Sequence, residues 1–159
     1  MEYLIKAEGE YRYIDEGQGE TLLLLHGLFG ALSNWAGVIN HFKTSYRVII
    51  PLMPIHEMPI KEVGCEGLTE FIEGFVDFKG LDKFSVIGNS LGGHIATLYT
   101  LKHQEKVRAL ILTGSSGLFE SAMGTSFPKR GDYDFIKDRT EKTFYDPKVA
   151  TKELVDGSK

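Results

Sequence analysis

The most constraining feature of this chain is the sequence Gly88-Asn89-Ser90-Leu91-Gly92, which follows directly after the run Lys83-Phe84-Ser85-Val86-Ile87. That run predicts a buried strand, and the apolar residues after the motif recur at helical spacing. A serine held between a strand and a helix must adopt a strained backbone conformation, so its neighbours must be small. We therefore predict a nucleophile elbow with Ser90 at its tip, in which Gly88, Gly92 and Gly93 leave room for the turn and for helix packing.

A second motif, His26-Gly27-Leu28-Phe29-Gly30, follows an unbroken apolar run at residues 21–25. Such a run predicts a strand that is buried on both faces. A carbonyl group attacked by Ser90 develops negative charge on its oxygen, and this charge needs fixed N–H donors in a dry site. We expect the backbone N–H groups of Leu91 and Leu28 to be these donors. For the His26 side chain we favour a structural role, in which it hydrogen-bonds the backbone of its own loop.

With Trp35 and the apolar run at 107–114, these two motifs resemble the amino-terminal part of an α/β-hydrolase-fold protein. The resemblance implies a mostly parallel sheet with helices on both faces, and a triad in the chain order Ser, Asp or Glu, His. Only His94 and His103 follow Ser90, and neither is well placed to take its proton. We therefore expect the triad acid and histidine to lie outside this chain, which would supply the nucleophile and the oxyanion donors of an esterase-like serine hydrolase and would be inactive alone.

The remaining pattern alternates strands and helices, which is typical of a parallel sheet. We predict strands at 3–7, 10–16, 21–25, 47–51, 83–87 and 107–113, and helices at 34–43, 68–78 and 91–103. Ser33 is the expected N-cap of the first helix. Residues 118–159 are more polar, and the resemblance implies that they begin a helical cap, with helices over 132–144 and 147–156. The predicted domains are thus a core at 1–117 and the start of a cap at 118–159.

Composition excludes several classes of function. The chain has 159 residues, a net charge of −4 and no basic patch, so we expect no nucleic-acid partner. Its apolar runs are too short to cross a bilayer, and its start does not have the pattern of a secretory signal. The single cysteine, Cys65, cannot form an internal disulfide, which agrees with a cytoplasmic location. We read His56-Glu57 as solvated loop residues rather than a metal pair, and hydrolysis by this route needs no metal or organic cofactor.

The apolar strand at 107–113 should be interior by resemblance, with further strands beyond it. In this chain it is predicted to form an unpaired edge, and such an edge invites pairing with another chain. We therefore expect a partner at this edge, either a complementing chain or a second copy in a homo-oligomer.

Three functions remain open at this level. The first is a serine hydrolase acting on a small ester-like carbonyl substrate. The second is a hydrolase of carbon–carbon bonds, because Asn89-Ser90 followed by Gly92-Gly93-His94 is also seen among such members of the family; Lys129 and Arg130 are weak candidates for binding an acidic substrate there. The third is a non-catalytic binding or assembly module. A dinucleotide-binding fold is disfavoured, because no G-x-G-x-x-G follows the first parallel strand.

Overall fold

The computed structural model describes residues 3–28, 35–55 and 64–118, and a few single positions beyond them. The chain divides into two compact units, Met1–Phe119 and Glu120–Lys159. In the second unit, the Asp146 carboxylate accepts a hydrogen bond of 3.0 Å from the Lys148 N–H group, as an N-cap residue does. The helices predicted over 132–144 and 147–156 otherwise fall largely outside the described residues.

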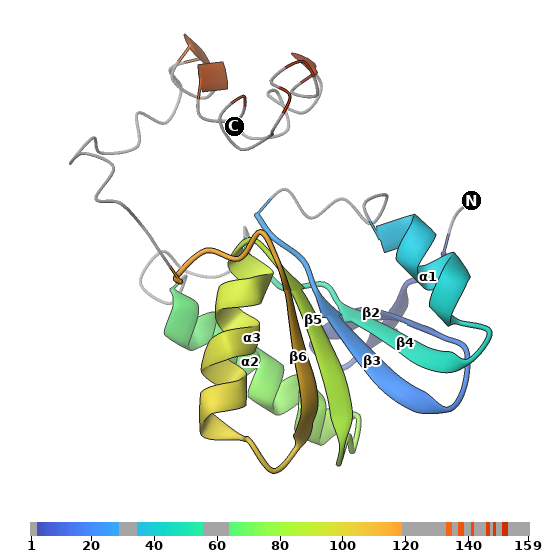
Figure 1. The fold of residues 1–159 in the computed structure, drawn as a ribbon. Coiled ribbons are helices and arrows are strands. Elements are labelled where there is room, and N and C mark those ends of the chain that lie inside the picture. Colours follow the sequence, from blue (N-terminus) through green and yellow to red (C-terminus); the bar gives the residue numbers. More distant parts are fainter. Residues whose placement is uncertain are drawn as a thin grey trace. The chain divides into compact units, whose positions relative to one another are not determined.

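A six-stranded sheet forms the first unit, with strand order β1-β2-β4-β3-β5-β6 (Figure 1). The strands β3 to β6 run parallel, and β1 and β2 join them antiparallel at one edge. The strands are β1 Lys6–Glu8, β2 Tyr11–Glu16, β3 Glu20–Leu25, β4 Tyr46–Pro51, β5 Phe84–Asn89 and β6 Val107–Thr113. The predicted mostly parallel sheet is therefore confirmed, and the strand at 107–113 is its edge strand.

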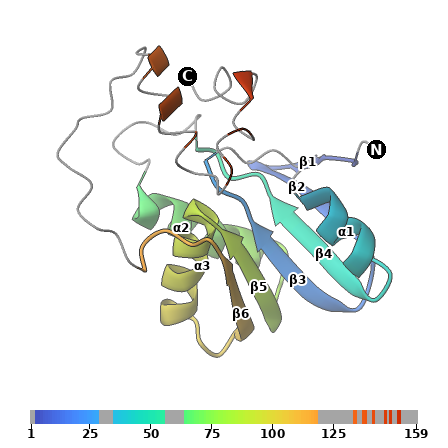
Figure 2. The ribbon, with the colours of Figure 1, turned by 45° about the horizontal axis from the view of Figure 1, so that its top comes forward.

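Helices cover both faces of this sheet, as a parallel sheet requires for its crossovers. The helices are α1 Ala36–Phe42, α2 Cys65–Phe78 and α3 Leu91–Lys102. The two longer helices, α2 and α3, lie on one face and α1 lies on the other (Figures 1 and 2). No helix in the described ranges is both long and apolar enough to cross a bilayer.

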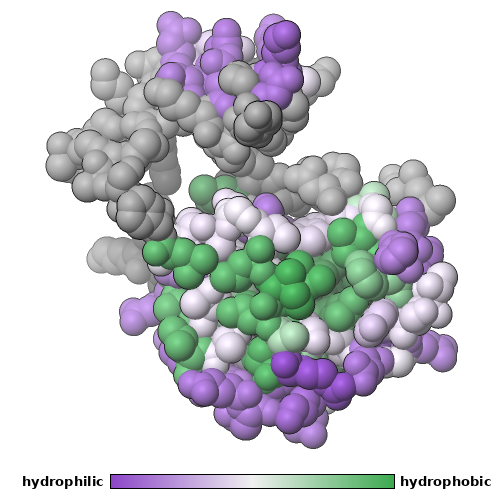
Figure 3. Space-filling view, in the orientation of Figure 1, coloured by the Kyte–Doolittle hydropathy of each residue, from purple (hydrophilic) through white to green (hydrophobic). Residues whose placement is uncertain are grey.

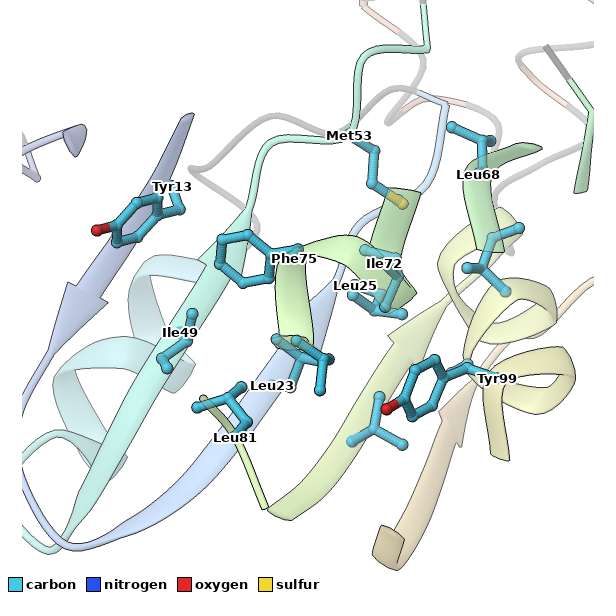
Figure 4. Packing of buried hydrophobic residues seen from close by; sticks show 14 of the residues in the cluster. Tyr13, Leu23, Leu25, Ile49, Met53, Leu68, Ile72, Phe75, Leu81 and Tyr99 are labelled. Carbon is cyan, nitrogen blue, oxygen red and sulfur yellow. The ribbon is translucent and has the colours of Figure 1, made fainter. Parts of the chain in front are cut away.

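The larger of two apolar clusters fills the space between the sheet and the helices α2 and α3. Its side chains include Leu68, Ile72 and Phe75 of α2 over Leu23, Leu25 and Ile49 of the sheet (Figure 4). A smaller cluster on the other face joins α1 to Leu24, Val48 and Ile50. Both clusters lie next to β3, whose residues Leu22 to Leu25 are all buried, as expected for a strand covered on both faces.

Several element boundaries differ from the predictions. The first helix begins at Ala36 with Trp35 at its N-cap, not at residue 34, and Ser33 lies outside the described residues. On α3, Leu101 is 64% exposed, because it lies on the opposite side of the helix from the buried Ile95 and Tyr99. On α2, Phe78 is 44% exposed, although its ring lies 4.9 Å from that of Tyr11. Apolar spacing finds a helix reliably, but it overestimates the width of the buried stripe.

A charged cluster joins the antiparallel strands to the end of α2. The Asp15 carboxylate accepts two hydrogen bonds from the Arg47 guanidinium, at 2.8 and 2.7 Å, and lies 3.2 Å from the Lys79 ammonium. Burial alone raises the pKa of Asp15, but the hydrogen bonds and charges of Arg47 and Lys79 outweigh it and lower the pKa. The ionised carboxylate is therefore the form that stabilises the fold.

We expect Asp15→Asn to lower the free energy of unfolding by about 2 kcal/mol or more at neutral pH, because it leaves three cations, those of Lys6, Arg47 and Lys79, without their shared anion. A depressed pKa means that this stabilisation is complete above the unfolded value of about 3.9 and is lost as the pH falls through the folded pKa. Urea unfolding at several pH values measures the difference between the two proteins, which should shrink below about pH 4. The control is Asp77→Asn, since Asp77 makes an exposed ion pair with Lys106 and should cost about 0.5 kcal/mol. Equal losses in the two variants would contradict a special role for Asp15.

Candidate active site

The elbow serine has an unusual backbone conformation. Ser90 lies between β5 and α3 with φ 53° and ψ −121°. It is the one non-glycine residue with a positive φ in the described part of the chain. Such a conformation costs about 1–3 kcal/mol and persists only where surrounding contacts hold it. The fold therefore presents Ser90 at the tip of a strained turn, where the sequence analysis expects the nucleophile.

Backbone hydrogen bonds from two directions hold this turn. The Ser90 carbonyl oxygen accepts bonds from Gly93 N–H at 3.0 Å, His94 N–H at 3.3 Å and Ser116 N–H at 3.2 Å. The Ser90 N–H group donates to the Thr113 carbonyl at 3.3 Å. The first turn of α3 and the loop after β6 thus hold the Ser90 peptide groups from both sides.

The side chain of Asn89 joins the end of β5 to the end of β6. Its amide nitrogen donates to the Thr113 carbonyl oxygen at 2.8 Å and to Thr113 Oγ1 at 3.2 Å. Thr113 Oγ1 in turn lies 3.3 Å from the Gly88 carbonyl oxygen. The sequence analysis did not single out Thr113 or Ser116. The signal that could have found Thr113 is strand register, because Asn89 and Thr113 are directly paired between β5 and β6.

The glycines around Ser90 stand where no side chain fits. A Cβ atom on Gly88 would lie 2.5 Å from the Gly92 carbonyl oxygen, and one on Gly92 would lie 2.6 Å from the His26 carbonyl oxygen. A Cβ atom on Gly93 would lie 2.5 Å from Ser115 Oγ. The start of α3 therefore packs directly on the backbone at the end of β3 and against the loop after β6.

The loop after β3 passes beside Ser90. A Cβ atom on Gly27 would lie 3.0 Å from Ser90 Cβ and 3.4 Å from Ser90 Oγ. Leu28, the next residue, is half exposed, and Leu91 is the first residue of α3. Among the described residues, neither the Leu28 nor the Leu91 N–H group donates a hydrogen bond within the fold. These two N–H groups remain our predicted oxyanion donors, and Phe29 and Gly30 of the same loop lie outside the described residues.

His26 is buried and uses both ring nitrogens. Nε2 accepts a hydrogen bond of 3.0 Å from the Met53 N–H group, and Nδ1 lies 2.9 Å from the Gly27 carbonyl oxygen. A ring that accepts at Nε2 and donates at Nδ1 is neutral. Burial lowers the pKa of His26, and the hydrogen bond to Gly27 opposes this only in part. The side chain thus ties its loop to the segment after β4.

The other described histidines have partners away from Ser90. His94 Nδ1 lies 3.5 Å from Cys65 Sγ, and His103 Nε2 lies 3.1 Å from a Glu73 carboxylate oxygen. The ring of His41 contacts Phe42. Among the described residues, none of these rings hydrogen-bonds the Ser90 hydroxyl, while His56-Glu57, Lys129 and Arg130 lie outside the described residues. In the same part of the chain, His, Cys, Asp and Glu side chains form no group of three that could hold a metal ion.

We expect Gly92→Ala to destabilise the protein by about 3 kcal/mol or more, because the added methyl group would meet the backbone carbonyls of Leu25 and His26. The matched control is Gly37→Ala, in α1, where an added methyl group meets no atom within 4 Å. That control should be neutral or should stabilise by up to about 1 kcal/mol. Thermal and urea unfolding of both variants measures this, and a Gly92→Ala protein as stable as the control would show that the close approach is not needed.

We also expect His26 to make stability dependent on pH. Because its pKa is lowered in the fold, its stabilisation is complete above the unfolded value of about 6.5 and is lost as the pH falls through the folded pKa. His26→Gln keeps a hydrogen-bonding side chain but cannot titrate, so it should remove this slope and cost about 1–2 kcal/mol at neutral pH. Urea midpoints from about pH 8 to about pH 5 test this. The slope should survive in His41→Gln, since His41 is exposed, and its survival in His26→Gln would refute the assignment.

Comparison with known proteins agrees with this geometry. The family model described as the alpha/beta hydrolase fold matches residues 20–143. The chain is also similar to a solved α/β-hydrolase enzyme from a sediment metagenome of the Mar Chica lagoon, with 34% identity and a TM-score of 0.70. That match covers 96% of this chain and 66% of the other.

Among curated proteins, the chain is 30% identical to a 2-hydroxy-6-oxononadienedioate/2-hydroxy-6-oxononatrienedioate hydrolase of Comamonas testosteroni, over 90% of this chain and 56% of the relative. It is 35% identical to a 2-hydroxy-6-oxo-6-(2'-aminophenyl)hexa-2,4-dienoic acid hydrolase of Metapseudomonas resinovorans, over 74% of this chain and 43% of the relative. The chain thus spans about half the length of these relatives. With a family match over most of its residues, a strained serine turn and a mostly parallel sheet, this chain belongs to the α/β hydrolase fold family.

Proposed function

We propose that this chain carries the nucleophile and the oxyanion donors of a serine hydrolase that cleaves a carbon–carbon bond beside a ketone in a 2-hydroxy-6-oxo-dienoic acid. The observation that carries the hydrolase part is the strained backbone of Ser90 (φ 53°), held beside the Gly27 loop. A strained serine at the end of a parallel strand places its hydroxyl at the carboxyl end of the sheet, where a substrate can reach it.

In this proposal the Ser90 hydroxyl attacks the ketone carbonyl. The Leu91 N–H group lies at the amino terminus of α3, where the helix dipole favours negative charge. The Leu28 N–H group approaches from the loop after β3, on the other side of Ser90. The Leu91 N–H group belongs to the first turn of α3, whose Gly93 and His94 N–H groups already bond the Ser90 carbonyl, so little reorganisation of this donor is needed when the oxyanion forms.

The substrate class rests on the relatives. The sequence analysis placed an ester-like substrate first and carbon–carbon bond hydrolysis second. The names of similar curated proteins favour the second, because three of them, at 30, 33 and 35% identity, are named as hydrolases of a dienedioate, a dienoate and a dienoic acid. Asn89 beside Ser90 fits the same choice. Ester and carbon–carbon hydrolysis share the attack on a carbonyl and differ in the group that leaves, so a single serine site serves for either.

The proposal also requires a proton acceptor for Ser90. A serine hydroxyl is a weak nucleophile at neutral pH without an adjacent base. The described histidines at 26, 41, 94 and 103 have partners elsewhere. The triad acid and histidine are therefore assigned to residues beyond those described, which leaves this part of the chain with the nucleophile, the oxyanion donors and their scaffold.

The test compares Ser90→Ala with the wild-type protein, each in a preparation that also contains the polypeptide supplying the triad acid and histidine, on 2-hydroxy-6-oxo-6-phenylhexa-2,4-dienoate and on a p-nitrophenyl ester. We expect the wild type to consume the dienoate faster than the ester, as measured by absorbance, and Ser90→Ala to lose at least about 10³-fold in kcat. A fluorophosphonate probe should label wild-type Ser90 once, as read by intact mass and peptide mapping.

The matched control is Ser85→Ala, since Ser85 lies on the same strand, β5, five residues before the nucleophile. It should retain turnover and labelling. If the wild-type protein instead prefers the ester, the substrate is an ester-like carbonyl compound and the proposed carbon–carbon bond hydrolysis is wrong. Absence of both turnover and label at a folded Ser90, with the polypeptide that carries the acid and histidine present, would contradict the enzymatic proposal and favour a binding module.

A further inference from the structure

Thr113, the last residue of β6, contacts three successive residues of the elbow. Its carbonyl oxygen accepts hydrogen bonds from the Ser90 N–H group at 3.3 Å and from the Asn89 side-chain amide at 2.8 Å. Its hydroxyl accepts a bond from the same amide at 3.2 Å and donates to the Gly88 carbonyl oxygen at 3.3 Å. A hydroxyl has one hydrogen to donate and two lone pairs, so both of its bonds form at the same time. Both oxygens of Thr113 thus bond the elbow.

The threonines of α3 use their hydroxyls differently. Thr97 and Thr100 donate to the carbonyl oxygens four residues earlier in the same helix, at Gly93 (2.9 Å) and Ala96 (2.7 Å). Such bonds are usual for threonine in a helix and join nothing across the fold. The Thr113 hydroxyl instead bonds residues that are 24 and 25 positions away and belong to another strand. Its bonds therefore fix the elbow rather than its own strand.

The charged side chains of these strands lie at the other end of the sheet. Arg108, near the start of β6, pairs with Glu20 at the start of β3. Figure 3 shows strongly hydrophilic side chains gathered at the bottom of the first unit, where β5 and β6 begin. Within the described ranges, the side-chain hydrogen bonds that reach residues 88–90 come from hydroxyl and amide groups. The elbow is therefore held by uncharged bonds, whose strength depends on their direction.

The segment that begins at Thr113 also fixes the predicted oxyanion donor. The Ser116 N–H group donates to the Ser90 carbonyl oxygen at 3.2 Å, and the Ser116 hydroxyl lies 3.4 Å from the same oxygen. A peptide group is planar, so this carbonyl and the Leu91 N–H group point in opposite directions from one rigid unit. Thr113 holds the preceding peptide group through the Ser90 N–H. The segment from Thr113 to Ser116 thus sets the direction of both peptide groups that flank the nucleophile.

We propose that Thr113 is a positioning residue for the reaction proposed above, and this inference rests on that proposed function. Its hydroxyl fixes the two residues before the nucleophile, and through them the directions of the Ser90 hydroxyl and the Leu91 N–H group. Thr113 does not touch the substrate. It acts on the alignment of the nucleophile and the donor when charge develops, so its loss lowers kcat and leaves KM nearly unchanged.

Thr113→Val tests this, because valine keeps the branched shape of threonine and removes only the hydroxyl. It is compared with the wild type in a preparation that also contains the polypeptide supplying the triad acid and histidine, using the phenylhexadienoate and the fluorophosphonate probe. We expect kcat and the labelling rate of Ser90 to fall about 10-fold, with KM changed less than about 2-fold. Thr113→Ser keeps the hydroxyl and should recover both rates to within about 3-fold of the wild type.

The matched control is Thr100→Val, which removes a hydroxyl bond of 2.7 Å within α3. Urea midpoints should move by similar amounts in the two valine variants, but only Thr113→Val should lose rate. A double-mutant cycle with Asn89→Ala tests whether Thr113 acts through the amide. In that background Thr113→Val should cost less than about 2-fold in labelling rate, because its partner is already gone.

Four results would overturn the proposal for Thr113. They are a folded Thr113→Val protein with the wild-type labelling rate, an equal loss in Thr100→Val, no recovery in Thr113→Ser, and an undiminished loss in the Asn89→Ala background. Thr113→Ala takes the place of Thr113→Val if circular dichroism shows that the latter does not fold.

The proposed function can fail separately. A wild type that prefers the ester overturns the carbon–carbon proposal alone, since the labelling comparison still decides the role of Thr113. A wild type that consumes the dienoate as fast as Thr113→Val does overturns the positioning role alone. Absence of both turnover and label in the folded wild type overturns both proposals.

Discussion

The site depends on the backbone conformation of one residue, Ser90. A positive φ at a serine is unfavourable by about 1–3 kcal/mol, and the turn survives because contacts on all sides determine it. Three N–H groups converge on the Ser90 carbonyl and its own N–H group is held by Thr113. At about 1 kcal/mol each, such bonds are enough to offset the strain. The strained turn leaves the Ser90 hydroxyl beside the loop that follows β3, 3.4 Å from where a Cβ atom on Gly27 would lie. The side chain of an ordinary strand residue would instead be covered by the helices.

Parallel strands explain why these contacts meet. The carboxyl ends of β3, β5 and β6 lie side by side at the same end of the sheet, because all three strands run in the same direction. The His26-Gly27 loop, Ser90 and the Thr113 to Ser116 segment each follow one of these strands directly. Close packing then requires glycine at the elbow, since a methyl group on Gly88 or Gly92 would overlap neighbouring backbone. Topology therefore brings the segments together, and the glycines set how closely they approach.

Much of this was predictable from local sequence. Strand and helix order, the elbow at Ser90 and the glycines follow from short patterns whose physical causes are local. The hydrogen bonds of Thr113 and Ser116 to Asn89 and Ser90 were not predicted. They depend on the register between β5 and β6, which a single sequence does not display. A different error affected α1, where the local cap signal at Ser33 suggested an earlier start than Ala36. Leu101 also fits the apolar spacing of α3 but is 64% exposed, so spacing alone does not tell which apolar residues are buried.

The proposed nucleophile and oxyanion donors lie close together in this part of the chain because these groups tolerate less displacement than a general base does. An oxyanion donor must stand within a few tenths of an ångström of where charge develops, so nucleophile and donors are best built on adjacent strands with short connections. Here a Cβ atom on Gly27 would lie 3.4 Å from Ser90 Oγ, and Leu91 is the next residue in the chain. A general base has to reach only one hydroxyl proton, and a side chain from a more distant segment can do this. His26 is neutral, buried and bonded at both nitrogens, so it ties its own loop to the segment after β4, and our proposal therefore requires another histidine as the base.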